Sequence, residues 1–165
     1  MIPITKTLTA PLKAVGIADS FTPMSNKIPQ LWDAFLPRLA EIAHQSAGDI
    51  SFGICFDETP LFITKQNPDE FLSLFVYMAA VQVDEFQEPL PEGMVSTLIP
   101  AGTYAVFTHK GSLATFHQTL AYIYQQWMPT APRKAGSPDF EWYDHRFSPN
   151  SPHSEIDVYI PIETN

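Results

Sequence analysis

Two stretches near the carboxyl end of the chain, residues 139–147 and 154–162, alternate between apolar and polar side chains. Alternation with a period of two is typical of β-strands, and the Pro-, Asn- and Ser-rich segment between the stretches predicts a turn. We therefore expect two adjacent strands here.

The alternation assigns the side chains of both stretches to faces. In the second stretch, Ile156, Val158, Ile160 and Ile162 share one face, and Glu155, Asp157 and Tyr159 share the other. In the first stretch, Glu141 lies with Tyr143, and Phe140 and Trp142 lie opposite. A sheet face that carries such carboxylates beside tyrosines, while its other face is apolar enough to hold helices, is either a solvated surface or the wall of a polar, aromatic pocket.

The rest of the chain divides into short elements bounded by prolines and glycines. Apolar residues at spacings of three and four predict a helix over 29–44, and Ser112 can cap a second helix that Pro129 ends. Strands are expected over residues 12–18, 50–57, 71–83, 94–99 and 103–109. Pro11 places the first of these near a sheet edge, whereas the long apolar run 71–83, after a loop over 60–68, is typical of a central strand.

Both halves of the chain show the same order of elements: strand, helix, strand, strand. This repetition predicts a duplicated α+β fold in which an antiparallel sheet carries two helices. The simplest packing puts the helices on one face and a central ligand groove on the other. For 165 residues we expect a single domain, with its core over about 12–162.

The composition narrows the class of protein. Apolar residues make up 45% of the chain and aromatic residues 13%, which is typical of a globular domain. The net charge of -9 argues against direct nucleic-acid binding, which depends on Lys and Arg contacts to phosphates. Cys55 is the only cysteine, so no internal disulfide can form and a reducing cytoplasm is the expected location. No apolar run reaches the ~18 residues of a membrane helix and no signal-peptide pattern opens the chain, so we expect no membrane association.

Six blocks of sequence occur in an order that is typical of one family. They are Phe52-Gly-Ile-Cys-Phe56, Met78-Ala-Ala-Val-Gln-Val83, Ile99-Pro-Ala-Gly-Thr-Tyr-Ala-Val-Phe-Thr-His-Lys-Gly111, Ile123-Tyr-Gln-Gln-Trp127, Phe140-Glu-Trp-Tyr143 and Ile156-Asp-Val-Tyr-Ile-Pro-Ile162. Together they resemble the GyrI-like small-molecule-binding domain, the effector-binding domain also found fused to AraC-type and MerR-type transcription factors. The resemblance extends from about Leu12 to Ile162.

This resemblance implies two strand-helix-strand-strand repeats side by side, with a ligand bound between them. In members that sense several drugs it also implies a buried glutamate that faces lipophilic cations. Some relatives sense drugs within regulators, one inhibits DNA gyrase, and some are reported to hydrolyse cyclopropane-containing toxins. No basic helix-turn-helix segment accompanies the matching region, so direct transcriptional control is not expected; a protein partner would be DNA gyrase or a regulator.

Glu141 and Glu155 are the candidates for the acid of such a site, because the alternation places each on a face with a tyrosine. Glutamate is seldom buried, so the residues alone favour a solvated surface; the resemblance favours Glu141 as the pocket acid. A carboxylate among aromatic rings binds an organic cation because the ligand's charge offsets its desolvation, and an empty site raises the pKa of the acid. The aromatic walls are assigned to Trp32, Tyr77, Phe107, Tyr143 and Tyr159. For Trp32 and Phe107 a plain core role fits equally well.

The same residues also fit a hydrolase, in which Glu141 or Glu155 acts as general acid or base on a strained, electrophilic ligand. No G-x-S-x-G element occurs, and no histidine partner is indicated for Cys55, which is interpreted as a small buried apolar residue. The five histidines, His44, His109, His117, His145 and His153, show no metal-ligand spacing, and we expect neither a metal nor a cofactor. Three functions stay open: binding of a hydrophobic, cationic small molecule, hydrolysis of a toxin, and interaction with a protein such as gyrase.

Overall fold

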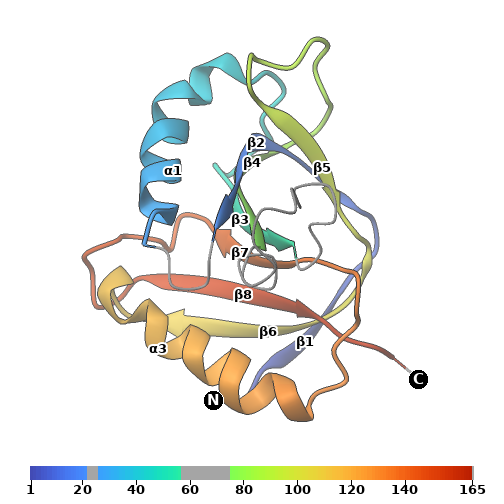
Figure 1. Ribbon diagram of the computed structural model, residues 1–165, viewed down its shortest axis with the longest axis vertical. Helices are drawn as coiled ribbons and strands as arrows, with labels where there is room; N and C mark the ends of the chain where they lie inside the picture. The colour runs from blue at the N-terminus through green and yellow to red at the C-terminus, as the bar shows by residue number, and fades with distance from the viewer. Residues whose placement is uncertain (22–25, 57–74, 165) are drawn as a thin grey trace, which may run out of the picture.

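The computed structural model describes residues 1–21, 26–56 and 75–164, which form one antiparallel sheet with two helical segments (Figure 1). The strands are β1 (Ile4–Leu8), β2 (Leu12–Phe21), β3 (Ser51–Phe56), β4 (Phe75–Val83), β5 (Val95–Ile99), β6 (Gly102–Lys110), β7 (Asp139–Tyr143) and β8 (Glu155–Pro161). Their order across the sheet is β1-β6-β8-β7-β3-β4-β2-β5. The predicted α+β class is confirmed. The predicted loop over 60–68 and the first residues of the predicted strand over 71–83 lie outside the described residues.

Both helical segments are α-helical only in part. α1 (Ile28–Phe35) passes into the 3-10 helix η1 (Leu36–Glu41), so the uninterrupted helix predicted over 29–44 is wrong in its second half. Pro37 explains the change, because its ring and its missing N–H oppose continuation of an α-helix. The second segment consists of η3 (Leu113–Thr115), α3 (Phe116–Ala121), the π-helix η4 (Tyr122–Trp127) and η5 (Met128–Thr130). Ser112 does occupy the N-cap position of η3, but its side chain makes no capping hydrogen bond.

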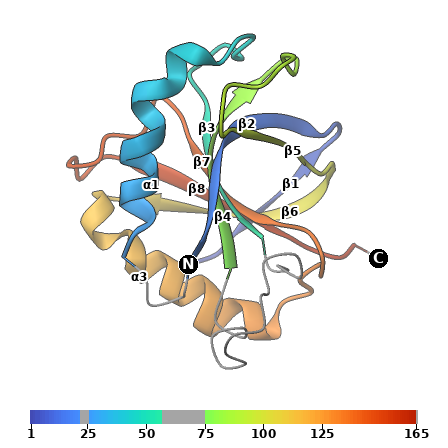
Figure 2. The ribbon, with the colours of Figure 1, turned by 45° about the horizontal axis from the view of Figure 1, so that its top comes forward.

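The two halves of the chain form the predicted repeats, β2-α1-β3-β4 and β6-α3-β7-β8, and β3 and β7 join them at the middle of the sheet (Figure 2). The strands that precede the repeats are exchanged: β1 leads into β2 but pairs with β6, and β5 leads into β6 but pairs with β2. These crossings connect the two ends of the sheet, which curls into a half-barrel. The strand predicted over 12–18 lies near a sheet edge as expected: β2 is the second strand from one end of the sheet, and the edge strand β5 pairs with its residues Leu12–Gly16.

The strand register decides which side chains share a face. One row of paired residues crosses the sheet through Ile17, Ala79, Gly53, Glu141, Val158 and Phe107. In β7 and β8, Phe140 pairs with Tyr159 and therefore lies on the opposite face, since neighbouring residues of a strand alternate. The expectation that Glu141, Glu155 and Tyr159 share one polar face is wrong. Glu141 pairs with the apolar Val158, so the polar positions of β7 lie on the opposite face of the sheet from those of β8.

Among the described residues, three clusters of apolar side chains fill the two faces of the sheet. On the face of Glu141, α1 packs Phe35 against β2 and β4, and the second helical segment packs Phe116 against β6 and β8. The third cluster fills the other face, where Phe140 stacks on Tyr159 with ring centroids 4.5 Å apart. Both helical segments thus flank the centre of the sheet on the face of Glu141. The expected groove was on the face without helices, and Glu141 does not lie on that face.

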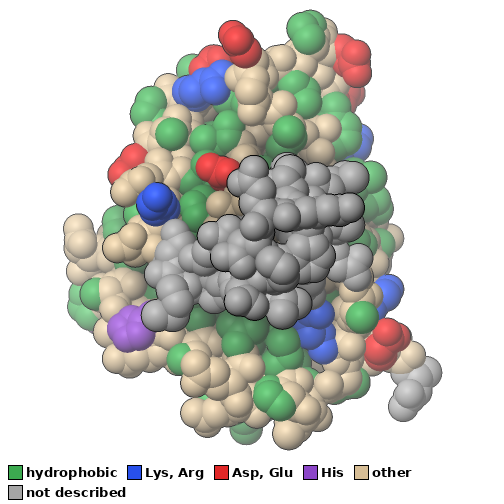
Figure 3. All heavy atoms as spheres, in the orientation of Figure 1, with side chains coloured by type: hydrophobic (Ala, Val, Ile, Leu, Met, Phe, Trp, Pro, Cys, Tyr) green, Lys and Arg blue, Asp and Glu red, His purple; other side chains and the backbone are tan. Residues whose placement is uncertain are grey.

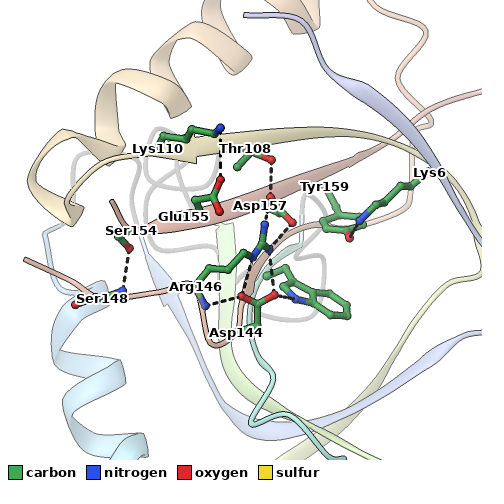
Figure 4. A network of polar contacts seen from close by, with 11 residues as sticks. Lys6, Thr108, Lys110, Asp144, Arg146, Ser148, Ser154, Glu155, Asp157 and Tyr159 are labelled. Atoms are coloured by element: carbon green, nitrogen blue, oxygen red, sulfur yellow. Dashed lines mark hydrogen bonds and ion pairs between the residues drawn. The ribbon is translucent and has the colours of Figure 1, made fainter. Parts of the chain in front are cut away.

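A polar network fixes the connection between β7 and β8 (Figure 4). Arg146 contacts Asp144 through Nε at 2.9 Å and Asp157 through Nη2 at 2.7 Å, and the indole of Trp142 donates to Asp144 at 3.0 Å. Burial opposes ionisation of Asp144, but the hydrogen bonds and the charge of Arg146 outweigh it and lower the pKa of Asp144 to about 2. The network therefore holds the register of the two strands by charge as well as by packing.

Charged side chains of the described residues are dispersed on the face of the molecule shown in Figure 3. On the face shown in Figure 3, the described Lys and Arg side chains lie apart from one another rather than in one patch. Among the described helices, none combines the length and the apolar character needed to cross a lipid bilayer. Among the described residues, three acidic side chains are buried instead of exposed: Asp139, Glu141 and Asp157.

Candidate ligand-binding site

Glu141 lies at the centre of the helix-covered face, on β7 between Gly53 of β3 and Val158 of β8. Only 9% of the residue is exposed. Its Oε1 accepts two hydrogen bonds, from the hydroxyls of Tyr77 and Tyr143, each at 2.8 Å. Both donors are neutral, and within the described part of the chain no Lys, Arg or His forms an ion pair with Glu141. The carboxylate is therefore held in position without being neutralised by these residues.

Trp32 adds an aromatic side chain from α1 to this site. Its indole Nε1 donates to the Tyr77 hydroxyl at 3.0 Å, and that hydroxyl donates onward to Glu141. The rings of Trp32 and Tyr143 meet edge to face with their centroids 5.6 Å apart. We call Glu141, Tyr77, Tyr143 and Trp32 the Glu141 cluster. Because α1 and β4 belong to the first repeat and β7 to the second, the cluster joins the two halves of the fold.

Gly53 makes room for the cluster. It lies directly opposite Glu141 on β3, and a Cβ atom there would collide with the Tyr77 hydroxyl and with Oε1 of Glu141. The missing side chain lets these two polar groups meet directly above the sheet, as a strand glycine often does where other groups approach closely. This close approach explains why a glycine occupies position 53 in the Phe52–Phe56 block.

The surroundings shift the proton affinities within the cluster. Burial raises the pKa of Glu141 above that of an ordinary glutamate, and the hydrogen bonds from Tyr77 and Tyr143 lower it only in part. Burial, followed by the nearby carboxylate, raises the pKa of both tyrosine hydroxyls well above 10. The tyrosines therefore remain protonated donors, and the group in the cluster that exchanges a proton is Glu141.

A second carboxylate lies on the same face, two residues before Glu141. Asp139 is only 3% exposed, and it accepts hydrogen bonds from Arg133 Nη2 at 2.8 Å and from the Tyr124 hydroxyl at 3.2 Å. The sequence analysis did not single out Arg133 or Tyr124 as partners of a buried acid. The sequence did contain an indication of such partners. Asp139 shares a strand face with Glu141, and a buried acid requires a partner.

The remaining predicted site residues lie away from the cluster. Phe107 is on the helix-covered face but packs against Trp127, with ring centroids 4.9 Å apart, beneath the second helical segment. Tyr159 is on the opposite face, where its hydroxyl accepts a hydrogen bond from Lys6 at 3.4 Å. Glu155 begins β8 and lies 3.7 Å from an exposed lysine (Figure 4). The structure thus brings together Glu141, Tyr143, Tyr77 and Trp32, and separates them from Phe107, Tyr159 and Glu155.

Comparison with known proteins identifies the family. A model of the GyrI-like small molecule binding domain matches residues 3–163. The chain belongs to the GyrI-like family. The transcriptional regulator BrlR of Pseudomonas aeruginosa is 41% identical over 138 residues, which cover 82% of this GyrI-like chain and 46% of the regulator. The chain therefore spans about half the length of this curated relative.

Solved structures share the GyrI-like fold at low sequence identity. The structure of SAV2435 bound to tetraphenylphosphonium has a TM-score of 0.71 at 19% identity, and the match covers 99% of this chain and 94% of that chain. The C-terminal domain of EcmrR has a TM-score of 0.62 at 14% identity, with 100% of both chains covered. The family resemblance and the fold expected from the sequence blocks are confirmed.

Proposed function

We propose that the Glu141 cluster of this small-molecule-binding domain takes a hydrophobic ligand with a positive charge, and that Glu141 is the charge partner. The observation that carries the proposal is a buried carboxylate held by two neutral hydroxyls and, among the described residues, by no cation. Buried charges in proteins are normally paired. A cationic ligand supplies the charge that these residues do not.

The aromatic side chains fit the apolar part of such a ligand. Trp32 and Tyr143 place two rings at the site, edge to face, with their planes inclined by 68°. Each ring that faces a bound cation adds ~0.5–2 kcal/mol of attraction. SAV2435 was solved with tetraphenylphosphonium, a cation enclosed by phenyl groups, which supports the same class of ligand here.

Binding in this proposal exchanges one positive charge for another. In the ligand-free protein the raised pKa of Glu141 keeps a proton on the carboxyl group to higher pH than in an ordinary glutamate, and burial is the main cause. The ligand's charge replaces that proton and offsets the desolvation of the carboxylate. The protein then acts by sequestering the ligand or by presenting its ligand-bound form to a partner.

The test compares a cation with a neutral compound of similar shape. Methyltriphenylphosphonium and triphenylphosphine oxide carry the same three phenyl rings, but only the former is charged. We expect Glu141→Gln to weaken the phosphonium by at least ~30-fold, about 2 kcal/mol, which is the lower range for removing one partner of a buried charge pair. The affinity of Glu141→Gln for the phosphine oxide should stay within roughly 3-fold of wild type, a difference under about 0.7 kcal/mol.

Glu155→Gln is the matched control, because it removes the same charge from a glutamate outside the cluster. Both compounds should bind this variant as they bind wild type. Equal losses for both compounds in Glu141→Gln would assign Glu141 a packing role and refute the proposal.

Recovery of the ligand separates binding from hydrolysis. A carboxyl group with a raised pKa can also serve as a general acid or base, so Glu141 fits a hydrolase as well. Mass spectrometry should return the bound compound unchanged. Turnover of more than one equivalent of a strained, electrophilic compound would support the hydrolase instead, and loss of gyrase supercoiling without any small molecule would support a role as a gyrase inhibitor.

A further inference from the structure

Two carboxylates share the central face of β7, but among the residues that the structure describes only Asp139 has a cationic side chain beside it. Asp139 pairs across the sheet with Cys55 and Glu141 with Gly53, so both acids project to the helix-covered face. Two residues along a strand span about 7 Å, which sets the separation of the two positions. The face therefore carries two buried acids whose separation a ligand with two charges can span.

Asp139 is already neutralised. Arg133 forms an ion pair with it at 2.8 Å, and the side chains of Arg133 and Asp139 are 17% and 4% exposed. The Tyr124 hydroxyl donates a further hydrogen bond to Asp139. The backbone of Arg133 is fixed as well, because it forms a bridge with Ile162 immediately after β8. A half-buried guanidinium is thus held against one of the two acids by the fold itself.

We propose that Arg133 sets the charge selectivity of the site, an inference that rests on the proposed function. Arg133 cancels the charge of Asp139, so Glu141 is the one acid of this pair that no described cation neutralises. The site then accepts ligands with one positive charge. A ligand with a second positive charge at the distance of Asp139 meets a guanidinium instead of a free carboxylate, and an unfavourable charge contact of this kind is an effective means of discrimination.

The experiment uses two quaternary ammonium compounds with the same hydrocarbon chain, pentyltrimethylammonium and pentamethylene-bis(trimethylammonium). The charges of the second compound are separated by about the distance between the two acidic positions, ~7 Å. Wild type should bind the monocation at least ~10-fold more tightly than the dication, which corresponds to about 1.4 kcal/mol. Arg133→Gln exposes the charge of Asp139 to the ligand and should reverse this preference.

The matched control is the double variant Arg133→Gln/Asp139→Asn, which removes both charges of the ion pair and keeps polar side chains of similar size. It should retain the preference of wild type for the monocation. Arg133→Lys keeps the positive charge and should also retain it. An unchanged ratio of affinities in folded Arg133→Gln, or a reversed ratio in Arg133→Lys, would overturn the inference.

Loss of either partner of a buried ion pair can prevent folding, so a variant of the other partner keeps the inference testable where Arg133→Gln does not fold. Asp139→Asn leaves the guanidinium charge beside Glu141 and should weaken the monocation by roughly 10-fold, whereas the double variant restores the affinity. Equal monocation affinity in wild type and Asp139→Asn would overturn the inference. Absence of Glu141-dependent binding in wild type would instead remove the proposed function, so the two failures are distinguishable.

Discussion

Replacing Gly53 by alanine tests whether the Glu141 cluster depends on the absence of a side chain at this position. The added Cβ would occupy space now filled by the Tyr77 hydroxyl and by Oε1 of Glu141, so at least one of these groups must move. Tyr77 is only 2% exposed and has little room to do so. Overpacking costs ~1–3 kcal/mol and loss of a buried hydrogen bond about 1 kcal/mol, while alanine regains ~0.5–1 kcal/mol in a strand. We expect a net loss of about 1–3 kcal/mol in the free energy of unfolding.

Urea unfolding and thermal melting measure this loss directly. In a domain of this size about 1–3 kcal/mol corresponds to a fall in Tm of roughly 3–9 °C. The affinity of Gly53→Ala for methyltriphenylphosphonium should also fall by at least ~10-fold, because Glu141 and Tyr77 no longer meet.

Gly136→Ala is the control for Gly53→Ala. Gly136 has a φ of 79° and no atom within 4 Å of an added Cβ, so alanine there strains the backbone by about 1–2 kcal/mol without touching the cluster. Its stability should fall while its affinity for methyltriphenylphosphonium stays at the wild-type value. Wild-type stability and affinity in Gly53→Ala would refute the reasoning about the cluster.

Two further predictions concern titration. The folded protein holds a proton on Glu141 more tightly than the unfolded chain does, so the ligand-free protein should lose stability as pH rises from about 4.3 through the raised pKa. Glu141→Gln should lack this loss and exceed wild type in stability at neutral pH; the same pH profile in both proteins would contradict the assignment. The sign is opposite for Asp144. Burial opposes its ionisation, but Arg146 lowers its pKa from 3.8 to about 2. Ionised Asp144 therefore stabilises the folded protein above the pKa of the unfolded chain, and this stabilisation is lost as pH falls toward 2. Asp144→Asn should cost about 1 kcal/mol at neutral pH, after allowance for solvent screening, and nothing below about pH 2; a loss that persists at low pH would indicate packing instead.

Much of the fold follows from local patterns, because alternation and helical spacing depend on residues near one another in sequence. The repeat order and most strand positions were predicted in this way. Pro37 shows the limit of spacing alone, since the apolar stripe continues past the residue where α1 ends. The exchange of β1 and β5 between the repeats was not predicted, because it joins segments that are distant in the chain.

The faces of β7 and β8 show why part of the site was placed wrongly. Glu141 and Tyr143 lie on one strand, so alternation alone predicts that they share a face. Tyr159 lies on another strand, and a shift of one residue in register exchanges every side chain between faces. Alternation within a strand contains no information on that shift. Arg133 lies outside any periodic element and reaches Asp139 only in the folded chain.

The exchange of a proton for the ligand's charge at Glu141 is the most direct test of the account. Isothermal titration of methyltriphenylphosphonium in buffers of different ionisation enthalpy counts the protons released on binding. Below the raised pKa of Glu141, wild type should release close to one proton per ligand, and its affinity should rise about tenfold per pH unit until the carboxyl group is ionised. Glu141→Gln should release none. Tight binding by wild type with no proton release and with an affinity independent of pH would contradict the claim that Glu141 is the charge partner.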